Sequence, residues 1–425
     1  MASKSMKPRL LFISPIVPSP DGPGLAMRPY YQIANLSQIY SIHLLVAGYS
    51  PISTTNTAHI KPFCERIDYL YRYRYSGWKL RQWNRCRRFM DYFRHLFNGH
   101  DLSFALDSAD RQYLRHNKTL ATIARMNFDR VHVFRIYLDS IAEILKEHGL
   151  QSFYSLDIDD IESETRRSIS GLFSLNRNFV NAFKFNNESI TYFNLETKSI
   201  PAYDQIFTCS HHDRDMLQNR FPDKVITALP NVVSIPEISL NHKSDHKFTI
   251  LFVGMMDYYP NTDAIIFFAE RIAPILREKS SQPWHLRVVG TPPRKKWMRS
   301  LKDFPEIKLS GFVKDLKPEY EAAGIVIVPI RGGGGTRIKI LEAFTHGIPV
   351  VSTSKGAEGL EVKNGVHLFI EDDPDLFADA CIRLMNDHQL RDEISHRAFS
   401  LAVSKYSPEI INHIWTETLP ETYRS

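Results

Sequence analysis

Short apolar runs alternate with amphipathic stretches along most of the chain, and this alternation restricts the fold more than any other feature of the sequence. A run of about four to eight apolar residues is typical of a buried strand, whereas apolar residues recurring every three or four positions indicate a helix. Strands that alternate with helices pair in parallel, because each helix returns the chain to the same end of the sheet. We therefore expect an α/β protein with doubly wound parallel sheets.

A polar, proline-bearing segment from Pro230 to Lys247 separates two series of these units. The chain has 425 residues, which is enough for two or three domains of ordinary size. We predict a Rossmann-like domain at residues 1–230, a second one at residues 231–405, and a helical tail at residues 406–425 that packs back on the first domain. Two such domains would face a shared crevice at the carboxyl ends of their strands, where doubly wound sheets bind ligands.

The expected elements follow from the apolar patterns. In the first half we predict strands at 9–14, 42–46, 130–133, 152–155 and 205–208, with one long helix at about 161–199. In the second half we predict strands at 248–253, 285–289, 325–328, 350–352 and 367–370, with helices near 261–278, 316–323, 337–346, 374–386 and 389–405.

Four consecutive glycines, Gly332–Gly335, follow an apolar strand and precede a helix. Glycines let a ligand approach the backbone closely, and the free N–H groups of a helix start attract phosphate. Arg337 and Lys339 stand at the start of that helix and suit the oxygens of a diphosphate. Glu342 lies further along the helix and is suited to accept two ribose hydroxyls. A flexible glycine turn with solvated charges is the plainer interpretation.

Four blocks of the second half resemble glycosyltransferase family 4, a group of retaining enzymes with the two-domain GT-B fold. The blocks are Phe252-Val253-Gly254 with Tyr259-Pro260-Asn261, then His285–Gly290, Ile307–Val313, and Gly332–Leu360 with Leu341-Glu342-Ala343. The first half matches only weakly, through its first strand, the Gly22/Gly24 loop, Arg28 and Asp157-Ile158-Asp159-Asp160. Members of polysaccharide-assembly systems are similar in having glycines and then Thr-Arg-x-Lys before the glutamate.

The resemblance implies transfer of a sugar from a nucleotide-diphosphate donor to a hydroxyl acceptor, with retention at the anomeric carbon and no metal or other cofactor. The acceptor would be a saccharide or a lipid-linked saccharide. Arg337 and Lys339 would stabilise the leaving diphosphate. Residues implied to bind the donor are Gly22, Gly24, Gly254, Asn261, Gly333, Gly334, Gly335, Thr336 and Glu342, and those on the acceptor side are Arg28, Arg135 and Asp157.

Three departures from the family pattern affect the site. The family has two glutamates eight positions apart, but Gly334 occupies the first position and only Glu342 remains. Met255 and Met256 stand where many members place an arginine and a lysine, so Arg337 and Lys339 take over the cationic role. The histidine often found in the first domain aligns with Phe134, and a structural role is the better interpretation of the neighbouring His132.

The acids Asp157, Asp159 and Asp160 allow two interpretations. Such a cluster is found in the metal-binding Asp-x-Asp motif of the other large glycosyltransferase fold. These acids, however, follow a strand and open a long helix, where carboxylates stabilise the positive end of the helix dipole. We favour that role and predict no metal site.

The net charge, 53 − 47 = +6, is concentrated in one segment. Residues 66–100 hold nine basic residues and two acids, and the remaining chain holds 44 basic and 45 acidic residues. Taken as a helix, 78–97 is amphipathic and suits the headgroup region of an anionic membrane, although a core-facing helix and a dock for an acidic acceptor stay open. The residues proposed to contact the membrane are Arg81, Trp83, Arg85, Arg88 and Phe93.

Other functions are less compatible with the sequence. A spread basic surface and nucleic-acid-binding motifs are missing, so no nucleic-acid partner is expected. The start of the chain has no long apolar region of an export signal, and four scattered cysteines fit a reducing compartment, so we expect a cytoplasmic location on the inner membrane face. A nicotinamide dehydrogenase would need G-x-G-x-x-G after a first strand, and neither half of the chain has this motif there. A nucleotide-sugar epimerase and a non-catalytic sugar-binding protein remain alternatives.

Overall fold

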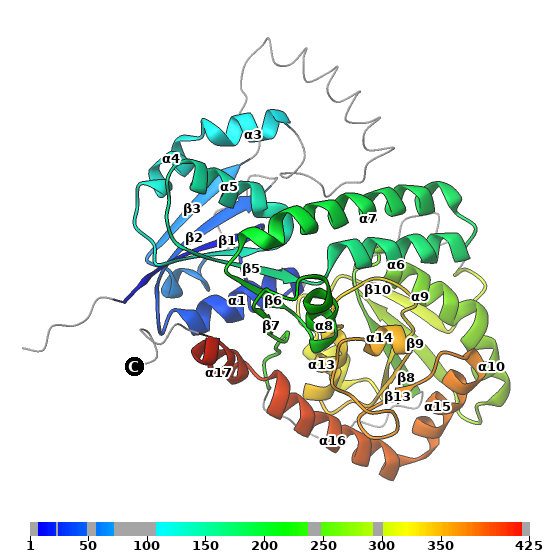
Figure 1. Ribbon diagram of the computed structural model, residues 1–425. Coiled ribbons are helices and arrows are strands. Elements are labelled where there is room, and N and C mark those ends of the chain that lie inside the picture. Colours follow the sequence, from blue (N-terminus) through cyan, green and yellow to red (C-terminus); the bar gives the residue numbers. More distant parts are fainter. Residues whose placement is uncertain are drawn as a thin grey trace, which may run out of the picture. The chain divides into compact units, whose positions relative to one another are not determined.

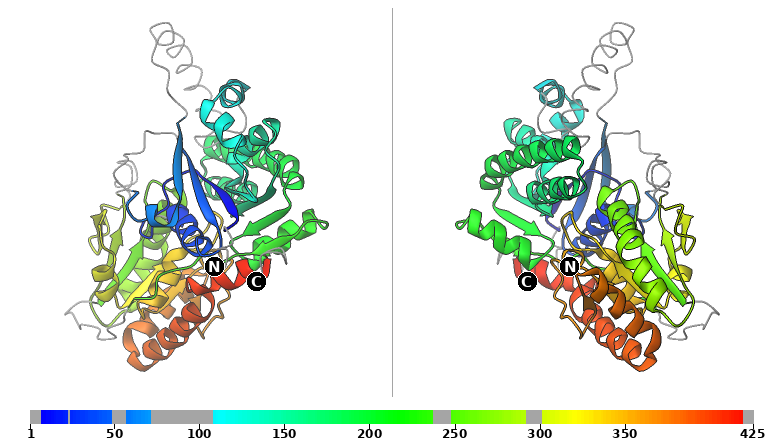
Figure 2. Two further views of the ribbon diagram at one scale, coloured as in Figure 1. Left: turned by 90° about the vertical axis from the view of Figure 1, so that its left-hand side faces the viewer. Right: turned by 90° about the vertical axis from the view of Figure 1, so that its right-hand side faces the viewer.

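The computed structural model describes residues 7–22, 24–48, 57–71, 108–236, 248–291 and 301–418. The chain forms two compact units, one of residues 1–230 with 411–425 and one of residues 231–410. Each unit is built around one parallel sheet covered by helices (Figures 1 and 2). The second unit therefore continues past residue 405, and the chain rejoins the first unit only at Ile411.

The sheet of the first unit has seven parallel strands in the order β3-β2-β1-β4-β5-β6-β7. The strands are β1 (Arg9–Ser14), β2 (Ser41–Gly48), β3 (Arg66–Tyr71), β4 (Arg130–Phe134), β5 (Phe153–Asp159), β6 (Gln205–Thr208) and β7 (Ile226–Ala228). The order reverses between β1 and β4, which is the switch point of a doubly wound sheet.

Both faces of this sheet are buried, as the continuous apolar strands predict. On one face Leu11 and Ile13 join the main core, and on the other Phe12 packs against His132, with ring centroids 4.8 Å apart. Trp415 covers that second face, and its ring centroid lies 5.4 Å from that of His132.

The helices of the first unit are α1 (Gly24–Leu36), α3 (Ser108–Arg115), α4 (Lys118–Ala124), α5 (Asp139–Glu147), α6 (Glu162–Leu175), α7 (Phe179–Ser199), α8 (His211–Arg220) and α17 (Glu409–Thr418), with short 3-10 turns at Lys61–Phe63, Ile136–Leu138 and Ile200–Ala202.

The second unit repeats the same plan with six parallel strands in the order β10-β9-β8-β11-β12-β13. The strands are β8 (Phe248–Val253), β9 (Trp284–Val289), β10 (Ile307–Gly311), β11 (Ile325–Val328), β12 (Val350–Ser352) and β13 (Phe369–Ile370). The helices are α9 (Tyr259–Phe267), α10 (Ala273–Lys279), α12 (Lys317–Glu321), α13 (Ile338–Thr345), α14 (Ser354–Ala357), α15 (Pro374–Asn386) and α16 (His388–Tyr406), and a π-helical turn at Phe268–Ile272 joins α9 to α10.

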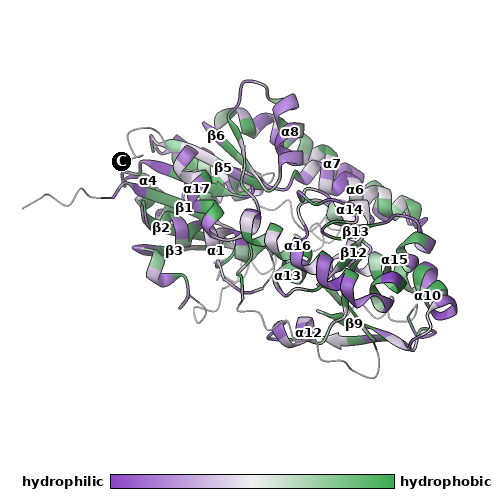
Figure 3. Ribbon diagram, turned by 90° about the horizontal axis from the view of Figure 1, so that it is seen from below, coloured by the Kyte–Doolittle hydropathy of each residue, from purple (hydrophilic) through white to green (hydrophobic). Residues whose placement is uncertain are grey.

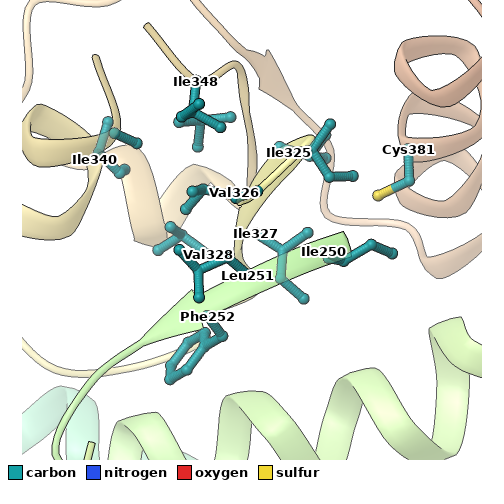
Figure 4. Packing of buried hydrophobic residues seen from close by; sticks show 14 of the residues in the cluster. Ile250, Leu251, Phe252, Ile325, Val326, Ile327, Val328, Ile340, Ile348 and Cys381 are labelled. Carbon is teal, nitrogen blue, oxygen red and sulfur yellow. The ribbon is translucent and has the colours of Figure 1, made fainter. Parts of the chain in front are cut away.

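The core of the second unit lies around its two central strands. Ile250 and Leu251 of β8 and Val326 of β11 are fully buried and contact helical residues such as Ile340 and Cys381 (Figure 4). Helices that cover the sheet, such as α15, carry apolar residues on the side that faces the core and polar residues elsewhere. Figure 3 shows this mixture of hydrophobic and hydrophilic residues. Each sheet has the strand order of a doubly wound, Rossmann-like domain.

Several sequence predictions need correction. The long helix expected at 161–199 is two helices, because Arg177 adopts a left-handed conformation (φ 56°) and reverses the chain between α6 and α7. Strands β3, β7 and β10 were not predicted as strands; β3 lies at the start of the basic segment.

The proposed membrane residues Arg81, Trp83, Arg85, Arg88 and Phe93 lie outside the described residues. Within the described part, no helix is both long and apolar enough to cross a bilayer.

Candidate functional site

The glycine turn lies at the switch point of the second sheet. Strand β11 pairs with β8 on one side and β12 on the other, and β8 and β11 are the strands between which the order reverses. Gly254 follows β8, and Gly332–Gly335 lead from β11 towards α13. The carboxyl ends at a switch point form the ligand-binding edge of a doubly wound sheet, so these two glycine segments occupy the expected position.

Two glycines let the backbone pack closely at this edge. Gly290, which follows β9, has φ +144°, and a Cβ atom there would lie 1.9 Å from the carbonyl oxygen of Gly254. A Cβ atom on Gly254 would in turn lie 2.8 Å from the Lys339 amine. The backbone contact and the positive φ require glycine at position 290, whereas a side chain at position 254 would displace the Lys339 amine from the end of β8.

Lys339 is held inside the site by a short chain of hydrogen bonds. Its amine donates to Asn261 Oδ1 at 2.9 Å, and Asn261 Nδ2 donates to the carbonyl of Met255 at 2.8 Å. The amine also lies 4.1 Å from the ring centroid of Phe252. Burial, and then the charge of Arg337, lower the pKa of Lys339 to about 7. Lys339 therefore loses its proton more readily than an ordinary lysine, and an anion beside it would favour the charged form.

Arg337 immediately precedes α13 and is buried. Its Nη1 contacts the carbonyl of Gly334 and donates to that of Gly335 at 2.6 Å, so the side chain holds the glycine turn. Its Nε and Nη2 atoms are buried without a hydrogen-bond partner. Unpartnered buried donors are rare in proteins and costly, and here they leave two N–H directions for an anion.

The start of α13 adds further donors. The helix has no capping side chain and no acidic residue in its first turn, so its first N–H groups keep their partial positive charge. Thr336, just before the helix, accepts a hydrogen bond of 2.8 Å from Asn231 Nδ2. The turn, the helix start and two cations therefore form a site suited to phosphate.

Glu342 lies on α13 behind the two cations and has a partner that the sequence did not reveal. Tyr320 Oη donates to Glu342 Oε2 at 2.8 Å, and the Tyr320 ring stacks on His346 with centroids 4.6 Å apart. Burial raises the pKa of Glu342, although Tyr320 and Lys339 oppose that rise. One carboxylate oxygen of Glu342 is thus fixed by Tyr320.

The predicted acceptor-side residues of the first unit form buried ion pairs. Arg28 on α1 contacts both oxygens of Asp157, at 2.9 and 3.0 Å, and donates to the carbonyl of Leu229 at 2.8 Å. Gln32 adds a hydrogen bond to Asp157 at 2.5 Å. Burial alone would raise the pKa of Asp157, but Arg28 outweighs it and the pKa lies below its ordinary value. Both side chains are engaged within the first unit.

Arg135 and Asp159 form a strained pair at the carboxyl ends of β4 and β5. Both residues have positive φ, 79° and 59°, which is uncommon outside glycine. Arg135 contacts Asp159 at 2.6 Å and Glu162 at 3.4 Å, and it also pairs with Asp160. The acids therefore pair with arginines, which corrects the sequence interpretation that they mainly stabilise a helix start.

The remaining predicted residues are distributed over both units. Gly22 and Gly24 belong to the first unit, where Gly22 is an exposed turn residue with φ +115° and Gly24 begins α1. Met255 is partly exposed and Met256 is buried. His132 is buried and contacts Ser155 Oγ through Nδ1 at 2.9 Å, and burial lowers its pKa to about 3. This histidine is a core residue.

The residues that sequence analysis missed are Tyr320 and Asn231. No sequence motif marks Tyr320 or Asn231, because each forms its hydrogen bond with a residue that is distant in the sequence. Asp159 was noticed only as part of an acidic cluster. Over the described ranges, no three His, Cys, Asp or Glu side chains gather in a manner that would hold a metal ion.

Comparison with known families bears on the second unit. Residues 247–387 match the family model of glycosyl transferases group 1. This segment, about a third of the chain, is therefore similar to glycosyl transferases group 1. It contains β8 to β13, both glycine segments, Arg337, Lys339 and Glu342.

A Klebsiella pneumoniae protein, described as an uncharacterized 44.6 kDa protein in the cps region, is 29% identical over 180 residues. The match covers 40% of this chain and 46% of that protein. The chain thus spans less than half the length of this curated relative.

Solved structures match almost the whole chain. A variant of S. aureus TarM in complex with fondaparinux, alpha-GlcNAc-glycerol and UDP has a TM-score of 0.66 at 11% identity, covering 98% of this chain and 100% of that one. Anabaena HepE in complex with UDP-glucose has a TM-score of 0.64 at 14% identity, covering 97% and 99%. At these identities the likeness establishes the GT-B fold shared by both units.

Proposed function

We propose that this protein is a retaining glycosyltransferase that moves a sugar from a nucleotide-diphosphate sugar to a hydroxyl acceptor. One observation carries the proposal. At the switch point of the unit that matches glycosyl transferases group 1, the unpartnered Nε and Nη2 of Arg337, the Lys339 amine and the uncapped start of α13 are gathered beside a glycine turn. Such a set of donors complements a diphosphate.

In the proposed complex, the diphosphate lies against Gly333–Gly335 and the first turn of α13. Arg337 directs its two free donors to phosphate oxygens, and Lys339 gains its proton as the anion approaches. Glu342 accepts hydroxyl groups of the ribose through the oxygen that Tyr320 leaves available. TarM and HepE, which share the fold, were solved with UDP and UDP-glucose, and this supports a uridine nucleotide sugar as the first donor to test.

The proposed site promotes the transfer by stabilising the charge that develops as the reaction proceeds. As the bond between sugar and phosphate breaks, negative charge grows on the departing diphosphate and positive charge on the anomeric carbon. Donors fixed before the reaction stabilise the growing negative charge without reorganising, which is the main way a site of this kind accelerates transfer. We propose no protein nucleophile; the departing phosphate accepts the proton of the acceptor hydroxyl on the face where the new bond forms, which retains the anomeric configuration.

The acceptor proposed is a saccharide or lipid-linked saccharide used in cell-surface polysaccharide synthesis. The Klebsiella relative is named for the cps region, which supports this direction. We propose that transfer takes place on the cytoplasmic face of the inner membrane, with the segment 66–100 contributing basic residues to anionic lipid. Arg28, Arg135 and Asp157 would act on the acceptor side by fixing the carboxyl ends of β4 and β5.

A ligand screen tests the proposal. Thermal unfolding is measured with UDP, GDP, ADP and the sugar conjugate of each, and a ligand at about 100 times its Kd should stabilise the protein by about 2.7 kcal/mol. The stabilising nucleotide sugar is then incubated with mixed saccharide acceptors, and NMR of the product gives the anomeric configuration. An inverted product refutes retention, and conversion of the donor to its epimer without an acceptor would identify an epimerase instead.

A further inference from the structure

Four large apolar side chains are exposed at the tip of the hairpin formed by α6 and α7. Leu175 ends α6 and is 63% exposed, and Phe179, Val180 and Phe183 begin α7 with 68%, 78% and 64% exposed. Single exposed apolar residues are ordinary on protein surfaces, but a contiguous group marks an interaction surface. We refer to these four residues as the hairpin tip.

The pattern along α7 shows that this exposure is built into the helix. One side of α7 packs on α6, which runs alongside it (Figure 1), and there Ala182, Ser189 and Tyr192 are buried. At about 100° per residue, Phe179, Phe183 and Ile190 fall together on a different side, roughly 120° away. Ile190 is 53% exposed, so an outward apolar face continues from the tip along the helix.

The charges around the tip have one sign. Residues 168–187 contain Arg177 and Lys184 and no aspartate or glutamate. Arg177 is exposed in the turn between the helices, and Lys184 follows Phe183. The acids of the two helices lie outside this stretch, at Glu162, Glu164, Glu188 and Glu196.

We propose that the hairpin tip inserts into the surface of an anionic membrane. Apolar side chains flanked by cations complement the boundary between lipid headgroups and acyl chains, where phosphates meet hydrocarbon. Two copies of the chain meeting tip to tip would place Arg177 and Lys184 of each copy together with no acid to pair them. An anionic lipid surface supplies both the apolar phase and the negative charge.

This inference does not depend on the proposed glycosyl transfer. It also differs from membrane contact through Arg81, Arg85 and Arg88, which rests on sequence alone. The two contacts make separate predictions, because each can be removed without changing the other.

Vesicle flotation of the full chain tests the proposal. Vesicles of phosphatidylglycerol with phosphatidylcholine, and of phosphatidylcholine alone, are mixed with the wild type and with F179S/V180S/F183S. The triple variant should lose about tenfold or more in partitioning to the anionic vesicles. The matched control, V225S/L376S/V403S, removes three exposed apolar residues elsewhere and should float like the wild type.

A charge variant provides an independent measurement. R177E/K184E should also weaken flotation with anionic vesicles, whereas K118E/K308E, with the same change of net charge at exposed positions elsewhere, should weaken it much less. Equal flotation of the wild type and both tip variants overturns the proposal, as does an absence of flotation by the wild type. If light scattering shows a wild-type dimer that F179S/V180S/F183S makes monomeric, and vesicles do not bind, the tip is a self-association surface.

Discussion

The phenol of Tyr320 donates a hydrogen bond of 2.8 Å to Glu342, although 22 positions separate the two residues in the chain. Tyr320 lies on α12 and is buried, and its ring stacks on His346, which bonds the backbone carbonyl of Glu342 through Nδ1 at 2.8 Å. Side chain and backbone of Glu342 are therefore positioned from one direction. The Glu342 carboxylate is therefore held in place by a buried neighbour.

We expect Y320F to raise the KM for the nucleotide sugar about three- to twentyfold while changing kcat little. A ribose contact stabilises ground and transition states alike, and the loss of a hydrogen bond to a carboxylate is worth about 1.5 to 3 kcal/mol at most. E342Q should shift KM in the same direction. The matched control is Y203F, which removes a similarly buried hydrogen bond to Asp139 in the first unit. A defect confined to kcat in either site variant would contradict the ribose role.

Replacing Arg337 or Lys339 by alanine should weaken nucleotide-diphosphate binding and slow transfer by roughly 10- to 1,000-fold, the scale of losing a charge-assisted contact or a transition-state donor. R287A serves as control, because Arg287 pairs with Glu319 in the same unit outside the proposed site. Steady-state kinetics and calorimetric titration with the nucleotide measure the effect. Wild-type kinetics in both R337A and K339A would rule out the phosphate site.

The affinity for the nucleotide diphosphate should depend on pH through Lys339. Burial and Arg337 lower the pKa of the free lysine to about 7, and a bound anion raises it, so binding takes up protons at neutral pH. Affinity should therefore fall as pH rises above about 7. Titration in two buffers of different ionisation enthalpy measures the proton uptake. K339R should remove this dependence, because arginine stays charged; an unchanged profile in K339R would assign it to another group.

Much of the fold was accessible from the sequence, because parallel strands buried on both faces leave continuous apolar runs such as Phe248–Val253 and Ile325–Val328. The failures have local causes. The left-handed backbone of Arg177 ends a helix that the sequence prediction extended through the polar residues 176–178. Strand β3 was not predicted because its two tyrosines and Arg66 were interpreted as part of the basic segment.

The candidate site could be predicted from the sequence only where its residues lie close together in the chain. Arg337, Lys339 and Glu342 share one helix start, so their proximity follows from spacing alone. The positions of the residues that contact them cannot be inferred from spacing. Asn261 and Tyr320 reach Lys339 and Glu342 through tertiary packing, and the hydrogen bonds of Arg337 to the glycine turn leave its Nε and Nη2 without a partner.

Transfer should continue in excess EDTA. In the proposed complex two cations and backbone N–H groups neutralise the diphosphate, and the acids Asp157, Asp159 and Asp160 are already paired with Arg28 and Arg135. Product formation is followed by chromatography with and without the chelator. Loss of activity that Mg²⁺ or Mn²⁺ restores would return the Asp-x-Asp interpretation to favour.

The pair of Arg28 and Asp157 should contribute strongly to the stability of the first unit. D157N leaves the guanidinium of Arg28 buried without a charged partner, which typically costs about 3 to 5 kcal/mol of unfolding free energy. D68N, which alters a partly exposed pair with His43 and Arg66, should cost much less. Because the pKa of Asp157 is lowered in the folded protein, its contribution is present above the unfolded value of about 3.9 and is lost as pH falls through the folded value. Urea unfolding from about pH 7 to pH 3 should show the wild type approaching D157N at the acid end. A constant difference between the two proteins over that range would show that the charge of Asp157 does not stabilise the fold.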